Sequence, residues 1–171
     1  MDIAATLRSY DGKRVAPFHA MAEAVRDGPE STIGQLVDLA ASGEMELQVG
    51  ATWVLKHLAE GGTAPGRVVT ERLLRLLERP LAPDALLHVL QMLPHMDIEA
   101  AHHGALRASL LGLIKSRRAF VRAWAYNGLG VLAGHDPSLR SEVERLFDRA
   151  AKADTAAVRA RIRHARAAMA G

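Results

Sequence analysis

Two apolar patterns recur along this 171-residue chain with a shared period of about 37 residues. The first begins at Leu47, Ala85, Val121 and Val158, in steps of 38, 36 and 37 residues. The second begins at Leu36, Leu73, Leu110 and Leu146, in steps of 37, 37 and 36 residues. Each pattern has helical spacing, and a period in this range is typical of stacked helical hairpins. The sequence therefore predicts an array of about four hairpins.

Residues typical of helix ends divide each repeat into two helices. The predicted outer helices lie near 32–42, 67–79, 104–115 and 138–152, and the inner helices near 44–60, 84–96, 118–133 and 155–170. The predicted capping residues are Thr32 with Gln35, Asp84, Asp136 before Pro137, and Asp154 with Thr155. Pro94 should kink or end its helix. A further helix around 14–26 should cap the first hairpin.

The inner helix of the third repeat also shows a family resemblance. Its sequence, Val121-Arg122-x-x-Ala125-x-x-Gly128-Leu129-Gly130-x-Leu132, resembles the second helix of a HEAT (armadillo-like) repeat, and Val158–Arg159 begins a weaker copy. The resemblance covers residues 30–171. It implies an all-α, right-handed α-α superhelix (solenoid) of about four HEAT-like helical hairpins with an N-terminal capping helix. Gln48 and Leu86 replace the usual arginine, so the Asp–Arg ladder between repeats is not expected in the N-terminal half.

We expect a single domain, 1–171, with a cap at 1–30 and repeats at about 31–62, 63–99, 100–135 and 136–171. The sequence has no cysteine, which excludes disulfides and thiolate chemistry. It shows neither a signal peptide nor a long apolar run, and we expect a cytoplasmic protein. Residues 1–104 carry a net charge of −5 and residues 105–171 carry +8. The basic half indicates a partner with phosphate groups, an acidic protein surface, or a plain solvated surface.

The helical period also predicts which residues of the inner helices face a partner. Counted from the first apolar residue of each inner helix, positions five and six point away from the predicted core, toward the concave face of a solenoid. These two rows supply the candidate binding residues Trp53, Gln91, Tyr126, Asn127, Arg163 and His164. Trp53 is the strongest candidate, unless the N-terminal segment folds over it. Trp124 should instead pack between repeats.

No pattern for catalysis, a metal or a cofactor is recognised. His57 and His95 are one repeat apart, too far to share a metal, and His102–His103 is expected in a loop. The chain lacks a phosphate-binding glycine loop and a Gly-x-Ser-x-Gly elbow. The enzyme question stays open, but the residues favour a protein without an active site.

Three classes of function remain. The first is a non-enzymatic protein-interaction scaffold that binds a peptide or helix in its concave groove. The second is nucleic-acid binding through the basic C-terminal half, similar to HEAT-like DNA alkylation-repair proteins, and its candidate phosphate or acidic-partner contacts are Arg117, Arg118, Arg159 and Arg166. The third is an accessory subunit or lyase-like chaperone. The acidic N-terminal half argues against a duplex along the whole groove, so we favour the scaffold.

Overall fold

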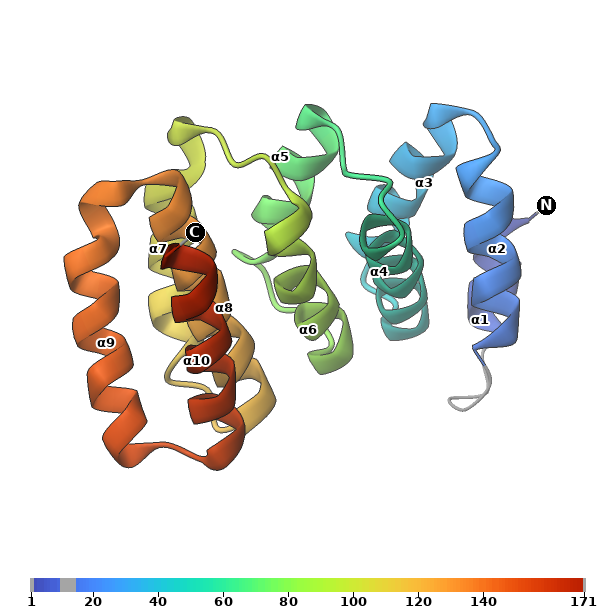
Figure 1. The fold of residues 1–171 in the computed structure, drawn as a ribbon. Helices are drawn as coiled ribbons and strands as arrows, with labels where there is room; N and C mark the ends of the chain where they lie inside the picture. Colours follow the sequence, from blue (N-terminus) through green and yellow to red (C-terminus); the bar gives the residue numbers. More distant parts are fainter. Residues whose placement is uncertain (1, 10–14, 171) are drawn as a thin grey trace. The chain divides into compact units, whose positions relative to one another are not determined.

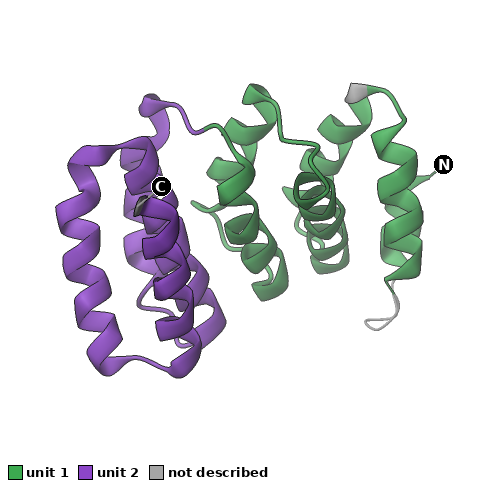
Figure 2. Ribbon diagram, in the orientation of Figure 1, with its two compact units in different colours: residues 1–97 green, residues 98–171 purple. Residues whose placement is uncertain are grey.

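The computed structural model describes residues 2–9 and 15–170, and these form ten α-helices and two short 3-10 helices, without a strand (Figure 1). The predicted all-α class is therefore confirmed. The chain divides into two compact units, residues 1–97 and 98–171 (Figure 2). The division lies beside the expected boundary between the second and third repeats. None of the helices in the described residues is long and apolar enough to cross a membrane.

Unit 1 contains α1 (Ile3–Arg8), α2 (Ala16–Arg26), α3 (Glu30–Ala40), α4 (Met45–Glu60), α5 (Arg67–Leu76), α6 (Pro83–Met92) and the 3-10 helix η1 (Leu93–His95). Helices α3 and α4 pack together, as do α5 and α6. The two pairs meet through contacts of α4 with α6 and of α3 with α5 (Figure 1). Helix α4 also receives α1 and α2. It is therefore the centre of this unit.

Close packing around α4 depends on a glycine. A Cβ atom at Gly50 would lie 2.7 Å from a methyl group of Leu7 on α1 and 3.0 Å from the ring of Phe18 on α2. Both of these side chains are buried. At the other end of α4, Gly62 has a φ of 92°, a conformation that favours glycine and ends the helix.

Unit 2 contains α7 (Ala100–Leu113), α8 (Ala119–His135), the 3-10 helix η2 (Pro137–Leu139), α9 (Arg140–Ala153) and α10 (Ala156–Ala170). Helix α8 packs against α7, α9 and α10, and its contact with α10 is the most extensive in the unit (Figure 1). The side chain of Ala165 on α10 would lie 3.0 Å from a Cβ at Gly130 of α8. Gly130 thus permits the close approach of the two helices.

The positions of the helices agree with the predicted ranges, although residue 14 of the expected cap helix lies outside the described residues. Pro94 follows the end of α6, as predicted. Asp136 accepts a hydrogen bond from the amide of Ser138 and caps η2. Two caps were wrong: α3 begins after Pro29 without a side-chain cap, and Asp84 lies inside the first turn of α6, which begins after Ala82. His102 and His103 lie in α7 and not in a loop, because α7 begins four residues earlier than predicted.

In each unit, a side chain on the first inner helix forms hydrogen bonds with a residue just before the second inner helix. In unit 2, Nε and Nη2 of Arg122 donate to the carboxylate of Asp154, just before α10, at 3.1 and 2.7 Å. In unit 1, Gln48 has the same place on α4, and its amide oxygen accepts from the backbone amide of Ala82, just before α6, at 2.9 Å. The Gln48 amide nitrogen donates to the carbonyl of Ser42 at 2.7 Å. Gln48 therefore links two hairpins without an ion pair.

Candidate functional site

Trp53 is half-buried and lies within a cluster of rings from α2 and α4. His57 stacks on it with ring centroids 5.1 Å apart and planes 11° apart. His19 meets it edge-on at 4.8 Å, and Phe18 lies at 5.7 Å. Of the two alternatives for Trp53, the structure shows the N-terminal segment packed against it. Its ring therefore has a structural role in unit 1.

We expect Trp53→Ala to lower the free energy of unfolding by about 1.5 kcal/mol, because a half-buried ring with several aromatic contacts is removed. A thermal melt followed by circular dichroism measures this change. His19→Ala is the comparison, because His19 contacts the rings of Trp53 and His57 but is exposed, so its removal should cost less than that of Trp53. An unchanged melting temperature for Trp53→Ala would show that α2 does not cover the ring in solution.

Tyr126 and Asn127 do not face solvent, contrary to the sequence prediction. They are 7% and 8% exposed. The ring of Tyr126 packs edge-on against Phe147 of α9 at 6.2 Å, and burial raises the pKa of its hydroxyl. The prediction assumed a single core-facing side, whereas α8 has neighbours on three sides. These two residues cannot form a binding surface while the unit is folded.

The other candidate binding residues are accessible to different degrees. Gln91 is half-buried on α6. Arg163 and His164 are exposed on α10, the last helix of unit 2. The two rows therefore do not form one continuous band of exposed side chains.

Three side chains that the sequence analysis did not propose as a binding site form a partly exposed surface on unit 2, and one of them, Trp124, packs against the next inner helix as predicted. Phe120 begins this surface and is 67% exposed in the first turn of α8. Trp124, one turn later on the same helix face, is half-buried. The guanidinium carbon of Arg161 on α10 lies 3.8 Å from the centre of the Trp124 ring. We call Phe120, Trp124 and Arg161 the α8–α10 surface.

Basic side chains outnumber acidic ones in unit 2. Residues 98–171 contain thirteen Lys and Arg, of which Arg107, Arg122 and Arg166 form ion pairs with acidic side chains. The other ten form none within the described residues: Lys115, Arg117, Arg118, Arg140, Arg145, Arg149, Lys152, Arg159, Arg161 and Arg163. Positive charge therefore remains uncompensated within unit 2.

The four arginines predicted as phosphate or acidic-partner contacts differ in exposure and in ion pairing. Arg117 and Arg118 are exposed just before α8, and Arg159 is exposed on α10. Arg166 is engaged, since it donates to Glu144 at 2.8 Å and to Asp148 at 2.5 Å. Of the four, Arg166 is thus the one that would have to break ion pairs before binding an anion.

His88 and Thr52 form a polar pair inside unit 1. The pKa of His88 is lowered to about 4 by burial and then by the nearby charge of Lys56, so its ring is neutral at pH 7. Its Nδ1 lies 3.0 Å from the hydroxyl of Thr52, which donates to the carbonyl of Gln48 at 2.7 Å. Across the described residues, no three His, Asp or Glu side chains lie close enough to hold a metal ion.

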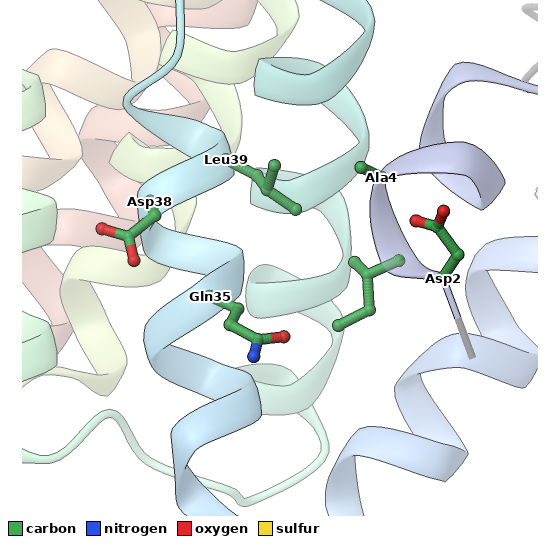
Figure 3. A pocket seen from close by; sticks show the side chains of 6 residues that line it. Asp2, Ala4, Gln35, Asp38 and Leu39 are labelled. Atoms are coloured by element: carbon green, nitrogen blue, oxygen red, sulfur yellow. The ribbon is translucent and has the colours of Figure 1, made fainter.

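A hollow lies between α1 and α3. It has a volume of about 360 Å³ and is lined by Asp2, Ile3, Ala4, Gln35, Asp38 and Leu39. Figure 3 shows the carboxylates of Asp2 and Asp38 on opposite sides of the hollow. Asp2 caps α1 by accepting from the amide of Ala5, and Asp38 pairs with Arg72. The two carboxylates are therefore not positioned for joint acid–base chemistry.

Comparison with known proteins gives no match to a family model, to a curated protein or to a solved structure.

Proposed function

We propose that this protein is a non-enzymatic interaction scaffold of the HEAT-like solenoid type, which binds a peptide or helix of another protein. Within each unit the hairpins pack inner helix on inner helix, which is the packing that such a solenoid repeats. A continuous superhelix with a concave groove is part of this proposal. So is a cytoplasmic location, which the lack of cysteine supports.

The exposed ring of Phe120 carries the proposal. The large hydrophobic side chains that are exposed in the described residues are Met45, Val68 and Phe120. Of these, Phe120 lies one helical turn from a partly exposed tryptophan, Trp124, whose ring is covered by Arg161. Aromatic and arginine side chains are the residue types that contribute most to binding energy at protein interfaces. The α8–α10 surface therefore has the composition of a peptide-binding site.

We expect peptides selected on the full-length protein from a displayed random library to depend on Phe120. Loss of one aromatic anchor typically costs 2 kcal/mol or more, so Phe120→Ala should weaken the selected peptides by about 30-fold or more. Isothermal titration calorimetry of the synthetic peptides measures this change. Because Phe120 is exposed, the substitution should leave the fold intact.

Val68→Ala is the matched control, because Val68 is 68% exposed on α5 in the other unit. Its affinity for the same peptides should stay within twofold of the unmodified protein. The proposal fails if the selection yields no binder, or if every selected peptide binds Phe120→Ala as tightly as the original chain.

Nucleic-acid binding is the second candidate, and the ten Lys and Arg without an ion pair in unit 2 favour it. Arg161 covers one face of Trp124, which leaves Phe120 as the more accessible ring for stacking on a base. Labelled duplex and single-stranded DNA, titrated at two salt concentrations, test this candidate. Binding that falls steeply with salt would support it over the peptide scaffold.

A further inference from the structure

Arg122 shows how this chain holds a carboxylate at the start of a helix. Two of its nitrogens, Nε and Nη2, donate to Asp154, and the third, Nη1, donates to the backbone carbonyls of Ser116 and Arg117 at 2.8 and 3.2 Å. The guanidinium is thus fully engaged, and only 18% of the Arg122 side chain is exposed. Paired N–H donors on one carboxylate are a strong and directional form of ion pair.

Arg159 has the same place on α10 that Arg122 has on α8, one repeat earlier. Its Nη1 donates to the carbonyl of Asp154 at 2.8 Å, five residues before it, as Nη1 of Arg122 does to Arg117. Its Nε and Nη2, the two nitrogens that hold the carboxylate in Arg122, have no acceptor among the described residues. Arg159 is exposed. Arg159 therefore keeps the backbone hydrogen bond that Arg122 makes, but no carboxylate of the described residues binds its Nε and Nη2.

The same side of α10 is uncovered over a further turn. On α8 the residue four positions after Arg122 is Tyr126, which is buried against Phe147 of the next hairpin. On α10 the residue four positions after Arg159 is Arg163, which is exposed and forms no ion pair with a described acidic side chain. Within the described residues, the corresponding side of α10 is therefore exposed and carries two cations, Arg159 and Arg163.

No acidic side chain described on the neighbouring helices neutralises the charges of Arg159 and Arg163, which we call the α10 edge. The carboxylate of Asp154 is held by Arg122, and those of Glu144 and Asp148 are held by Arg166. A ligand for the edge should therefore bring its own negative charge. The group that binds the equivalent arginine, Arg122, is the carboxylate of Asp154 just before α10. The expected ligand is therefore a protein carboxylate at the start of a helix and not a phosphate.

We propose that Arg159 and Arg163 form a second interaction surface, which binds an acidic segment of another protein. A carboxylate of that segment would take the place on Arg159 that Asp154 takes on Arg122. This surface lies on a different side of the inner helices from Phe120, because Arg159 and Phe120 differ by about 160° in helical position when the two repeats are aligned. It is independent of the peptide site proposed above.

Anisotropy of a labelled peptide of ten glutamates, titrated with the full chain at low salt, tests this inference. A peptide of ten glutamines provides the uncharged comparison. Arg159→Ala and Arg163→Ala should each weaken glutamate binding about fivefold, and Arg159→Lys should restore only part of the loss because lysine cannot donate in the paired geometry. Arg145, exposed on α9 without an ion pair, is the matched control, and Arg145→Ala should change the affinity less than twofold.

Several results would overturn the inference. Equal losses for Arg145→Ala and Arg159→Ala would show a diffuse basic surface. Tighter binding of a ten-residue oligothymidylate with the same dependence on Arg159 would show a phosphate site. Self-association of the chain that Arg159→Ala abolishes would assign the edge to a second copy. Phe120→Ala should leave glutamate binding unchanged, so failure here is distinguishable from failure of the peptide site.

Discussion

Phe147→Ala should lower the free energy of unfolding by about 3–5 kcal/mol. Phe147 is fully buried on α9, where its ring contacts that of Tyr126 on α8. The guanidinium of Arg166 on α10 lies 5.6 Å from the same ring. One side chain therefore joins three helices, and its loss would leave a cavity between them. Guanidinium titration followed by circular dichroism measures the change.

The neighbouring residue Leu146 provides the control. It lies on the same helix but is only half-buried, so Leu146→Ala should cost clearly less. Similar losses at the two positions would place the α9 helix in a different rotation from the one described. A loss below about 1 kcal/mol for Phe147→Ala would contradict the close packing of α8, α9 and α10 around this ring.

Arg122→Met should lower the free energy of unfolding by about 2–3 kcal/mol at pH 7. Methionine keeps much of the apolar stem, but the buried side of Asp154 loses its charged donor, and the carbonyl of Ser116 loses a hydrogen bond. The side chains of Arg122 and Asp154 are 18% and 15% exposed, so water can replace little of this interaction. Arg118→Met removes an exposed arginine nearby and should have almost no effect.

The contribution of this ion pair should disappear in acid. The hydrogen bonds from Arg122 are the main cause that lowers the pKa of Asp154 below its usual value. A carboxyl group whose pKa is lower in the folded state stabilises the fold above its unfolded pKa of about 4, and this stability is lost as the pH falls through the lowered folded pKa. The stability difference between the original chain and Arg122→Met should therefore be full near pH 7 and should shrink below about pH 4. A difference that stays constant down to pH 2 would contradict the pairing.

The sequence predicted the helices well, because their positions depend on apolar spacing. The first apolar residues of the four inner helices, Leu47, Ala85, Val121 and Val158, are all buried. The short helix α1 was missed, although Asp2, which caps it, is a typical N-cap residue. A helix of six residues carries too little periodicity to be recognised.

The candidate site was predicted less well, since exposure depends on how many neighbours a helix has. Tyr126 lies at an angle that faces solvent on a helix with one partner, but α8 has three. Phe120 was missed because it precedes the aligned repeat by one residue, although it lies on the same helix face as Trp124. Gln48 shows a third limit. Because Gln48 replaces an arginine, the sequence predicted no Asp–Arg contact between these hairpins. The Gln48 amide nevertheless links them, since it donates to Ser42 and accepts from Ala82.

The chain has two tryptophans, and each unit contains one of them: Trp53 in residues 1–97 and Trp124 in residues 98–171. With Trp53→Phe the remaining indole emission reports on unit 2, and with Trp124→Phe it reports on unit 1. If the two denaturation curves coincide, the whole chain melts as one cooperative body. If they separate, each pair of hairpins is its own foldon, and one half of the protein can open while the other stays folded.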